Sequence, residues 1–250
     1  MRVLLIVEYD GTNYAGWQMQ KNAPTIQEEL EKAILAATGQ SCRVAGAGRT
    51  DAGVHAKGQC AQFDIESNIP ADKFSYVLNL VLPEDIRVRE SRQVSADFHV
   101  RRGAVAKHYR YTIFNSPHAS AIERFTTAHV RQDLDIQSMR AAAKFLKGKH
   151  DFSAFRAAGS DIIGSVRTIY SIEITKVAEN IYIDVVGNGF LYNMVRIIAG
   201  TLIDVGKGRM APHAVQMILE SKDRTLAGAT APARGLTMMA VYYEGTFRTK

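Results

Sequence analysis

A glycine-rich run in the first half of the chain places one carboxylate beside an arginine and a histidine. The run reads Gly46-Ala47-Gly48-Arg49-Thr50-Asp51-Ala52-Gly53-Val54-His55. Closely spaced glycines indicate a loop whose backbone passes near other atoms, and an aspartate near an arginine stays ionised at neutral pH. Asp51 therefore has the properties of a nucleophile or a charge stabiliser. It could equally cap a turn or pair with Arg49.

Common cofactor and metal motifs do not fit this sequence. The third glycine of a G-x-G-x-x-G fingerprint would fall at position 51, which is Asp, and no Gly-Lys-Ser/Thr follows. The two cysteines, Cys42 and Cys60, form neither a CxxC pair nor a zinc spacing with histidine. The run around Asp51 is therefore neither a dinucleotide fingerprint nor a P-loop, and the cysteines do not indicate a zinc site.

A second motif, Lys107-His108-Tyr109-Arg110-Tyr111, alternates cationic and aromatic residues. On a strand, Lys107, Tyr109 and Tyr111 share one face, and His108 and Arg110 share the other. Such a surface can stack on a base while it holds phosphate. The alternative is a half-buried strand whose tyrosines pack on the core.

A third motif, from Phe190 to Arg196, leads into an apolar segment that continues past Gly200. An arginine on a mostly buried helix needs a partner. For Arg196 that partner is expected to be Asp51, and the alternative is a structural pair with another acid such as Asp184 or Asp204.

A fourth motif, from Gly148 to Arg156, contains adjacent His150 and Asp151. No serine nucleophile or metal spacing accompanies them, so acid–base chemistry is not supported. The phenylalanines at 152 and 155 favour core packing, and Arg156 a phosphate or structural contact.

The elements that must position these residues follow from the hydrophobic pattern. In the first half, Thr25 and Glu28 form a capping box before a helix that Gly39 ends. Buried or alternating apolar runs predict strands and a second helix. The expected ranges are strands 3–9, 43–46, 58–65 and 86–94 and helices 25–39 and 71–82.

The second half repeats this order. Strands are expected at 105–115, 169–177, 181–187 and 236–243, and helices at 135–148, 191–205 and from 212 to 221. Two β-α-β-β-α-β units predict an α+β protein of two tandem ferredoxin-like domains. The expected domains are 1–103, which carries the Asp51 loop, and 104–250. A cleft between their two antiparallel sheets would be a natural place for a large ligand.

Charge is distributed unevenly along the 250 residues. The net charge is +6, and residues 101–149 hold 10 Lys and Arg against 3 Asp and Glu. A basic stripe suits a polyanion such as nucleic acid, although a solvated basic surface would look the same. The N-terminal apolar run is about five residues long, too short for a signal or a membrane span. The protein is therefore expected to be soluble and cytoplasmic, with no membrane partner.

These motifs together resemble the tRNA pseudouridine synthase A (TruA) family over nearly the whole chain. The Gly-Arg-Thr-Asp-x-Gly-Val-His run around Asp51 is the most specific of the matching pieces. The others, in order along the chain, are Glu8-Tyr9-Asp10-Gly11-Thr12, Gly16-Trp17-Gln18, Thr25-Ile26-Gln27, Gln59, Phe98-His99, Tyr109-Arg110-Tyr111, Asp151-Phe152 through Arg156, Arg167-Thr168, Phe190 through Arg196, Gly200, Val205-Gly206, Lys222-Asp223-Arg224, Ala231-Pro232-Ala233 and Gly235-Leu236.

The resemblance implies a cofactor-free isomerase that converts uridine to pseudouridine. The substrate would be tRNA, at positions 38, 39 and 40 of the anticodon stem-loop, and the enzyme would be a homodimer. The sheets of its two domains would form a central RNA-binding cleft, and domain 104–250 would bind RNA and complete the active site. Asp51 would be the nucleophile, Tyr109 would stack on the target base, Arg196 would pair with Asp51, and Arg49 would help to hold the site open. Leu236 would line the base pocket, and the remaining substrate contacts would be His55, Gln59, Lys107 and Arg110.

One position departs from the family pattern, because relatives often have arginine where this chain has His108. The change affects RNA affinity more than the catalytic residues. Two alternatives to this interpretation stay open: a non-catalytic RNA-binding protein, and a pseudouridine synthase with other RNA targets.

Overall fold

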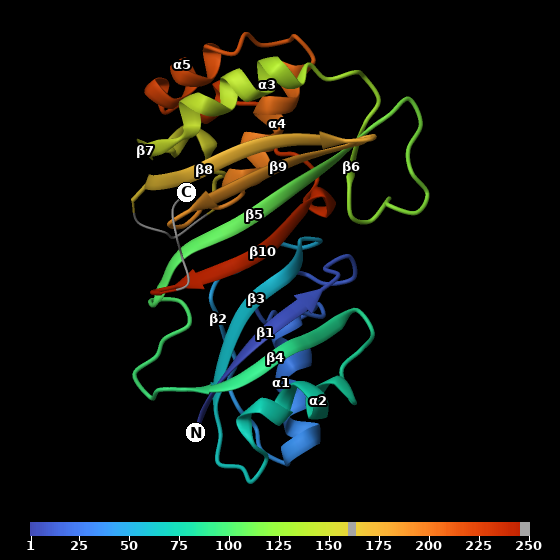
Figure 1. Ribbon diagram of the computed structural model, residues 1–250, viewed down its shortest axis with the longest axis vertical. Helices are drawn as coiled ribbons and strands as arrows, with labels where there is room; N and C mark the ends of the chain where they lie inside the picture. The colour runs from blue at the N-terminus through green and yellow to red at the C-terminus, as the bar shows by residue number, and fades with distance from the viewer. Residues whose placement is uncertain (160–163, 246–250) are drawn as a thin grey trace. The chain divides into compact units, whose positions relative to one another are not determined.

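The computed structural model describes residues 1–159 and 164–245, and its strands and helices group into two compact units (Figure 1). One unit comprises Met1–Val105 and the strand residues from Thr237 onward. The other comprises Ala106–Leu236. Both units combine helices with mostly antiparallel strands, as the sequence predicts for an α+β protein. No helix in these two ranges is long and apolar enough to cross a membrane.

The first unit follows the order β-α-β-β-α-β. Its strands pair in the order β4-β1-β3, with β2 antiparallel to β3 and β10 parallel to β3 through Thr237 and Met238. Helices α1 and α2 lie together on one face of this sheet (Figure 1). The element bounds are β1 Arg2–Tyr9, α1 Ile26–Thr38, β2 Ala45–Gly46, β3 His55–Asp64, α2 Phe74–Asn79, β4 Ile86–Val94 and β10 Leu236–Tyr243.

Helix α1 begins and ends where its capping residues predict. The Thr25 side chain accepts a hydrogen bond from the Glu28 backbone N–H at 3.4 Å, which satisfies one free donor of the first turn. Gly39 ends the helix with a left-handed φ of 72°. The buried side chains of α1, including Leu30 and Ile34, contribute to the core beneath β1.

The second unit places β5 beside β9, β8 and β7 in an antiparallel sheet, with short β6 parallel to β5. Helices α3, α4 and α5 gather on one side of these strands (Figure 1). The element bounds are β5 Ala104–Asn115, β6 Ala128–Val130, α3 Ile136–Ala143, β7 Gly148–Asp151, β8 Val166–Val177, β9 Asn180–Gly187, α4 Met194–Gly206 and α5 Ala214–Ser221.

Several predicted elements have different bounds in the structure. The expected helix 71–82 is a 3-10 turn followed by α2, and the expected helix 135–148 ends at Ala143 in a second 3-10 turn. The sequence did not predict β6 or β7, because strands of three and four residues carry too little periodic pattern. Helix α4 begins three residues later than predicted, since Asn193 has a left-handed φ of 58° that cannot belong to a helix.

Candidate active site

Asp51 is half-buried on a loop that connects β2 to β3. The Asp51 carbonyl accepts a hydrogen bond from the Val54 N–H at 3.1 Å, and Gly53 takes a left-handed φ of 73°. The loop therefore closes in a tight turn immediately after Asp51. The predicted alternative, that Asp51 belongs to a turn, is consistent with this backbone and does not conflict with a chemical role.

The segment from Tyr14 to Trp17 holds the backbone on both sides of Asp51. The Trp17 N–H donates to the Thr50 carbonyl at 3.0 Å, and the Gly53 N–H donates to the Tyr14 carbonyl at 3.3 Å. Gly16 lies so close to the loop that a Cβ there would be 2.4 Å from the Thr50 oxygen, and its φ of 98° also disfavours other residues. The loop is thus fixed by contacts that a larger residue at position 16 would break.

Buried polar side chains support the same loop from within the unit. The Tyr9 hydroxyl lies 2.8 Å from Thr50 Oγ1, and the Gln59 amide Nε2 donates to the Gly48 carbonyl at 2.8 Å. Gln59 is fully buried and Tyr9 is 2% exposed. Burial raises the pKa of Tyr9 well above its ordinary value, so the phenol keeps its proton.

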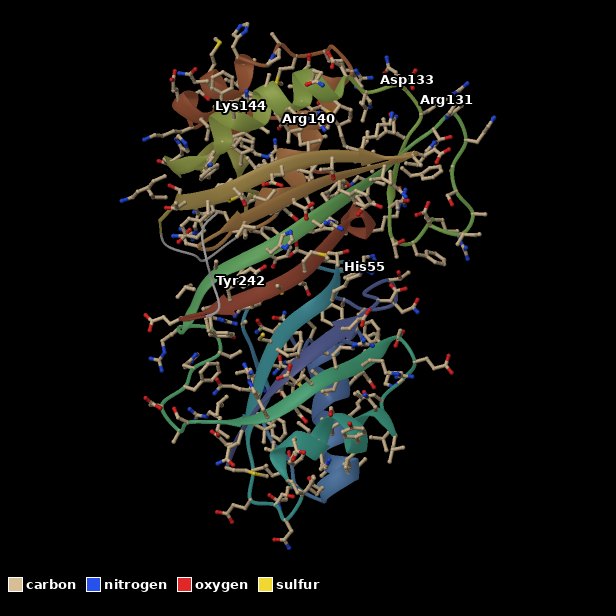
Figure 2. The ribbon with its side chains drawn as sticks, in the orientation of Figure 1. His55, Arg131, Asp133, Arg140, Lys144 and Tyr242 are labelled. Carbon is tan, nitrogen blue, oxygen red and sulfur yellow. The ribbon has the colours of Figure 1, made fainter. Side chains whose placement is uncertain are left out.

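His55 is the first residue of β3 and lies at the C-terminal end of the loop (Figure 2). Its ring is 4% exposed, and its Nδ1 accepts a hydrogen bond from the Gly11 N–H at 3.1 Å and lies 3.0 Å from Asp10 Oδ1. Burial alone would raise the pKa of Asp10, but hydrogen bonds from Thr12 and the nearby His55 ring outweigh it and lower that pKa. His55 and Gln59, both expected to bind substrate, are therefore also structural contacts of the loop.

Arg49 is exposed, and Arg101 of the same unit lies near it. Partial burial, and then the neighbouring Arg49 cation, lower the pKa of Arg101. Arg101 is not among the candidate residues expected from the sequence. Its position at the start of the basic stripe was the signal available for it.

Tyr109 and Tyr111, from the second unit, are both more buried than a pair of exposed stacking residues would be. Tyr109 is 7% exposed and meets the edge of the Phe190 ring with centroids 5.2 Å apart. Tyr111 is fully buried, and its hydroxyl donates to the Pro232 carbonyl at 2.9 Å. For Tyr111 the core-packing alternative is confirmed, while the stacking role of Tyr109 stays a prediction. Lys107, on the same strand, is half-exposed.

His108 and Arg110 share the opposite face of β5, as the alternation predicts, and both contact Asp184. Asp184 Oδ1 lies 2.6 Å from His108 Nε2 and 2.9 Å from Arg110 Nε. Burial alone would raise the pKa of Asp184, but these two hydrogen bonds and the Arg110 charge lower it. The Arg110 guanidinium also lies 4.8 Å above the Tyr182 ring. Asp184 is thus bound to β5 residues, and any substrate contact of Arg110 would compete with this pair.

Arg196 is held in the first turn of α4. Its Nη1 donates to Asn193 Oδ1 at 2.7 Å, and its Nε donates to the Ala231 carbonyl at 2.8 Å. The Ala231 N–H returns a bond to the Arg196 carbonyl at 3.1 Å. The alternative acid Asp204 pairs with Arg209 at 3.4 Å. The predicted pairing of Arg196 with Asp51 stays a prediction.

Leu236 is 6% exposed and follows the 3-10 turn Ala233–Gly235. Tyr111 holds this turn through the Pro232 carbonyl, and Arg234 Nε donates to the Thr127 carbonyl at 3.1 Å. Leu236 therefore occupies a well-defined position, which suits a residue that lines a pocket. That role is a prediction.

The motif from Gly148 to Arg156 is structural where its contacts are defined. Hydrogen bonds from Ser153 and Ser165 lower the pKa of Asp151, and Lys222 lies 3.2 Å from its carboxylate. Phe152 and Phe155 are fully buried, so core packing is confirmed. Arg156 is half-buried. Within residues 1–159 and 164–245, no group of three His, Cys, Asp or Glu side chains could hold a metal ion.

Comparison with known proteins identifies the family of this chain. A family model described as tRNA pseudouridine synthase matches residues 5–101 and 142–244, so the chain belongs to the tRNA pseudouridine synthase family. Pseudouridine synthases are isomerases, and this chain is an isomerase by that membership.

Individual relatives give a narrower comparison. The tRNA pseudouridine synthase A of Ruminiclostridium cellulolyticum is 52% identical over 97% of this chain and 99% of its own. That of Acetivibrio thermocellus is 52% identical over 96% of this chain and 99% of its own. The resemblance to tRNA pseudouridine synthase A is thereby confirmed. A solved chain of an H/ACA RNP bound to a substrate RNA containing 2'-deoxyuridine matches with a TM-score of 0.40 at 12% identity, covering 96% of this chain and 49% of that one.

Proposed function

We propose that this protein isomerises uridine to pseudouridine in tRNA, at positions 38, 39 and 40 of the anticodon stem-loop, with Asp51 as the nucleophile. The observation that carries the proposal is the Asp51 loop itself. It presents a half-buried carboxylate on a backbone held at Gly48, Thr50 and Gly53, in a chain that is 52% identical to proteins named tRNA pseudouridine synthase A.

The proposed isomerisation requires few groups beyond a correctly positioned carboxylate. The glycosidic bond from C1′ to N1 breaks, the uracil turns, and C5 bonds to C1′. N1 gains a proton and C5 loses one, so no electrons are exchanged and no cofactor is required. Asp51 would attack C1′, and removal of a sugar proton by the same carboxylate is the alternative route. The target base would be flipped out of its stack to reach the site.

Other side chains take roles that their local contacts support. Tyr109 would stack on the flipped base, which is worth about 1–3 kcal/mol for base–aromatic contact. Arg196, aimed by Asn193 and Ala231, would pair with Asp51 and keep it ionised. Leu236 would line the base pocket. The cation of Arg49 would hold the site open, and Lys107 and Arg110 would contact the RNA.

The proposed architecture is two ferredoxin-like domains with an RNA-binding cleft, in a cytoplasmic homodimer. The pairing order β4-β1-β3-β2, with two helices, supports this assignment for the first unit. In the second unit, β5, β9 and β8 pair consecutively and α3 and α4 accompany them. Light scattering of the purified protein tests the dimer.

The proposal is tested by mapping pseudouridine at nucleotide resolution. Purified protein is incubated with unmodified tRNA transcripts, and RNA from a strain lacking the gene is mapped in parallel. The expected result is pseudouridine formed only at positions 38–40 of the transcripts and missing only from those positions in the strain that lacks the gene. Modification at other positions or in other RNAs would replace the substrate assignment, and binding without any modification would favour a non-catalytic RNA-binding protein.

A further inference from the structure

Three polar side chains are buried directly beneath the Asp51 loop. Tyr9 is 2% exposed, Thr50 is 6% exposed and Gln59 is fully buried. Tyr9 and Gln59 lie on the adjacent strands β1 and β3, and Thr50 belongs to the loop itself. The polar atoms of these residues therefore have little access to water and depend on one another and on the loop for hydrogen bonds.

The bonds of this set end on the residues that precede Asp51. Tyr9 OH meets Thr50 Oγ1 at 2.8 Å, one residue before Asp51, and Gln59 Nε2 reaches the Gly48 carbonyl at 2.8 Å, three residues before it. They bracket Arg49. After Asp51, backbone bonds at Gly53 and Val54 and the buried His55 ring hold the loop. The bonds of Tyr9 and Gln59 thus act on the approach to the carboxylate.

This buried set is poorly suited to stability alone. Among the described residues, Gln59 Oε1 has no hydrogen-bond partner, although it is fully buried. A buried polar atom without a partner is unfavourable, and apolar side chains of similar volume can replace buried polar pairs without loss of stability. Apolar replacements would fill the same space but would remove the side-chain hydrogen bonds to Gly48 and Thr50.

We propose that Tyr9, Thr50 and Gln59 are positioning residues, which fix the Asp51 carboxylate for the chemical step and do not touch the RNA. This inference rests on the proposed function and assigns Gln59 a role through the loop in place of a contact with substrate. A group that only positions the nucleophile affects the rate of the chemical step more than the binding of tRNA, because a displacement of about 1 Å can cost on the order of 100-fold in rate.

The test is single-turnover pseudouridine formation on a saturating tRNA transcript by Tyr9→Phe, Thr50→Val and the double variant. Tyr9→Phe keeps the ring that packs beside Trp17, with centroids 6.3 Å apart, and removes only the hydroxyl. We expect each single variant to slow the rate about 10- to 100-fold, with tRNA affinity within about twofold of the wild type. The double variant should be no slower than the slower single variant, because both remove the same bond.

Two further variants separate positioning from general destabilisation. Tyr243→Phe deletes another tyrosine hydroxyl of the same unit, which donates to the carbonyl of Val100, a residue outside the loop, at 2.9 Å, and it should keep the wild-type rate. Thr50→Ser retains the hydroxyl and should restore most of the rate lost in Thr50→Val, even if Tyr9→Phe folds poorly.

The outcomes are distinct from those of the proposed function. A wild-type protein that forms no pseudouridine would overturn the proposed function itself. An active wild type with a Thr50→Val rate equal to that of Thr50→Ser would overturn the positioning role alone. Independent, multiplicative effects in the double variant, or a loss confined to tRNA affinity, would also overturn it.

Discussion

At the scale of single residues, neighbouring groups set the positions of the candidate catalytic side chains more than the conformational preferences of those side chains do. Arg196 is aimed by Asn193 and Ala231, and Tyr109 is set edge-on against Phe190. The sequence could select Asp51, Tyr109 and Arg196 because an acid, an aromatic ring and a buried cation are unusual in their contexts. It placed Tyr9 in a matching motif but could not reveal its contact with Thr50, a residue 41 positions away.

Replacing Arg196 tests the partner of Asp51. Arg196→Ala should abolish turnover at pH 7, and Arg196→Lys should not restore it, because an ammonium cannot reproduce the planar fork of donors. Asn193→Gly serves as the control. It removes the amide that aims Arg196 but tolerates the left-handed φ at this position, so a smaller loss of rate is expected. Near-normal turnover of Arg196→Ala would refute the pairing.

Replacing Tyr109 tests the stacking role. Tyr109→Leu should fold normally and lose about 10- to 100-fold in rate, which corresponds to the stacking energy of one base on one ring. Tyr109→Phe keeps the ring and should retain most of the activity. Single-turnover rates and thermal unfolding measure the two effects separately. Equal rates for the leucine and phenylalanine variants would show that the ring does not stack on the base.

At the scale of elements, helix ends set by nearby residues could be predicted from the sequence. Short strands and strand ends that pair with residues far along the chain could not. The capping residues Thr25 and Gly39 predicted both ends of α1, because each acts on its own backbone. The start of β3 at His55 was predicted three residues too late. Its first two residues pair with Thr237 and Met238, far along the chain, while the local glycines indicate a loop. Strands β6 and β7 likewise depend on distant partners.

The contact between Gly16 and the loop gives a prediction at this scale. Gly16→Ala places a Cβ against the Thr50 carbonyl, so it should lower the unfolding free energy by about 1–3 kcal/mol and slow pseudouridine formation. Gly39→Ala is the matched control. It has a similar positive φ, but no atom lies within 4 Å of the added Cβ, so it should cost stability without a loss of rate. Denaturant unfolding and single-turnover assays measure both. Equal rates for the two variants would contradict the role of the loop contact.

At the scale of the whole molecule, the basic stripe of the sequence is spread over several elements. Its members lie before and on β5, on either side of β6, on α3, and from the 3-10 turn after α3 into β7. Figure 2 labels Arg131 in the loop after β6, Arg140 on α3 and Lys144 in that 3-10 turn. Arg110 already pairs with Asp184, and Arg140 donates to the Ile174 carbonyl. A count of charges along the sequence therefore overstates the cations available to one RNA.

The salt dependence of tRNA binding follows from this distribution. The logarithm of the association constant should fall linearly with the logarithm of salt concentration, with a slope of about −3 or steeper, because each neutralised phosphate contributes roughly −0.7 to −0.9. The slope should also stay well short of the value for ten phosphates, one for each cation of the stripe. Titrations at several salt concentrations measure it, and a flat dependence would exclude phosphate contacts as the main source of affinity.

The central claim, that Asp51 is the nucleophile, is tested most directly by Asp51→Ala and Asp51→Asn with wild-type protein beside them. Both variants should fold, bind tRNA with affinity close to that of the wild type, and form no pseudouridine at positions 38–40 in a nucleotide-resolution map under single-turnover conditions. Pseudouridine formed by either variant at the wild-type rate would contradict the assignment.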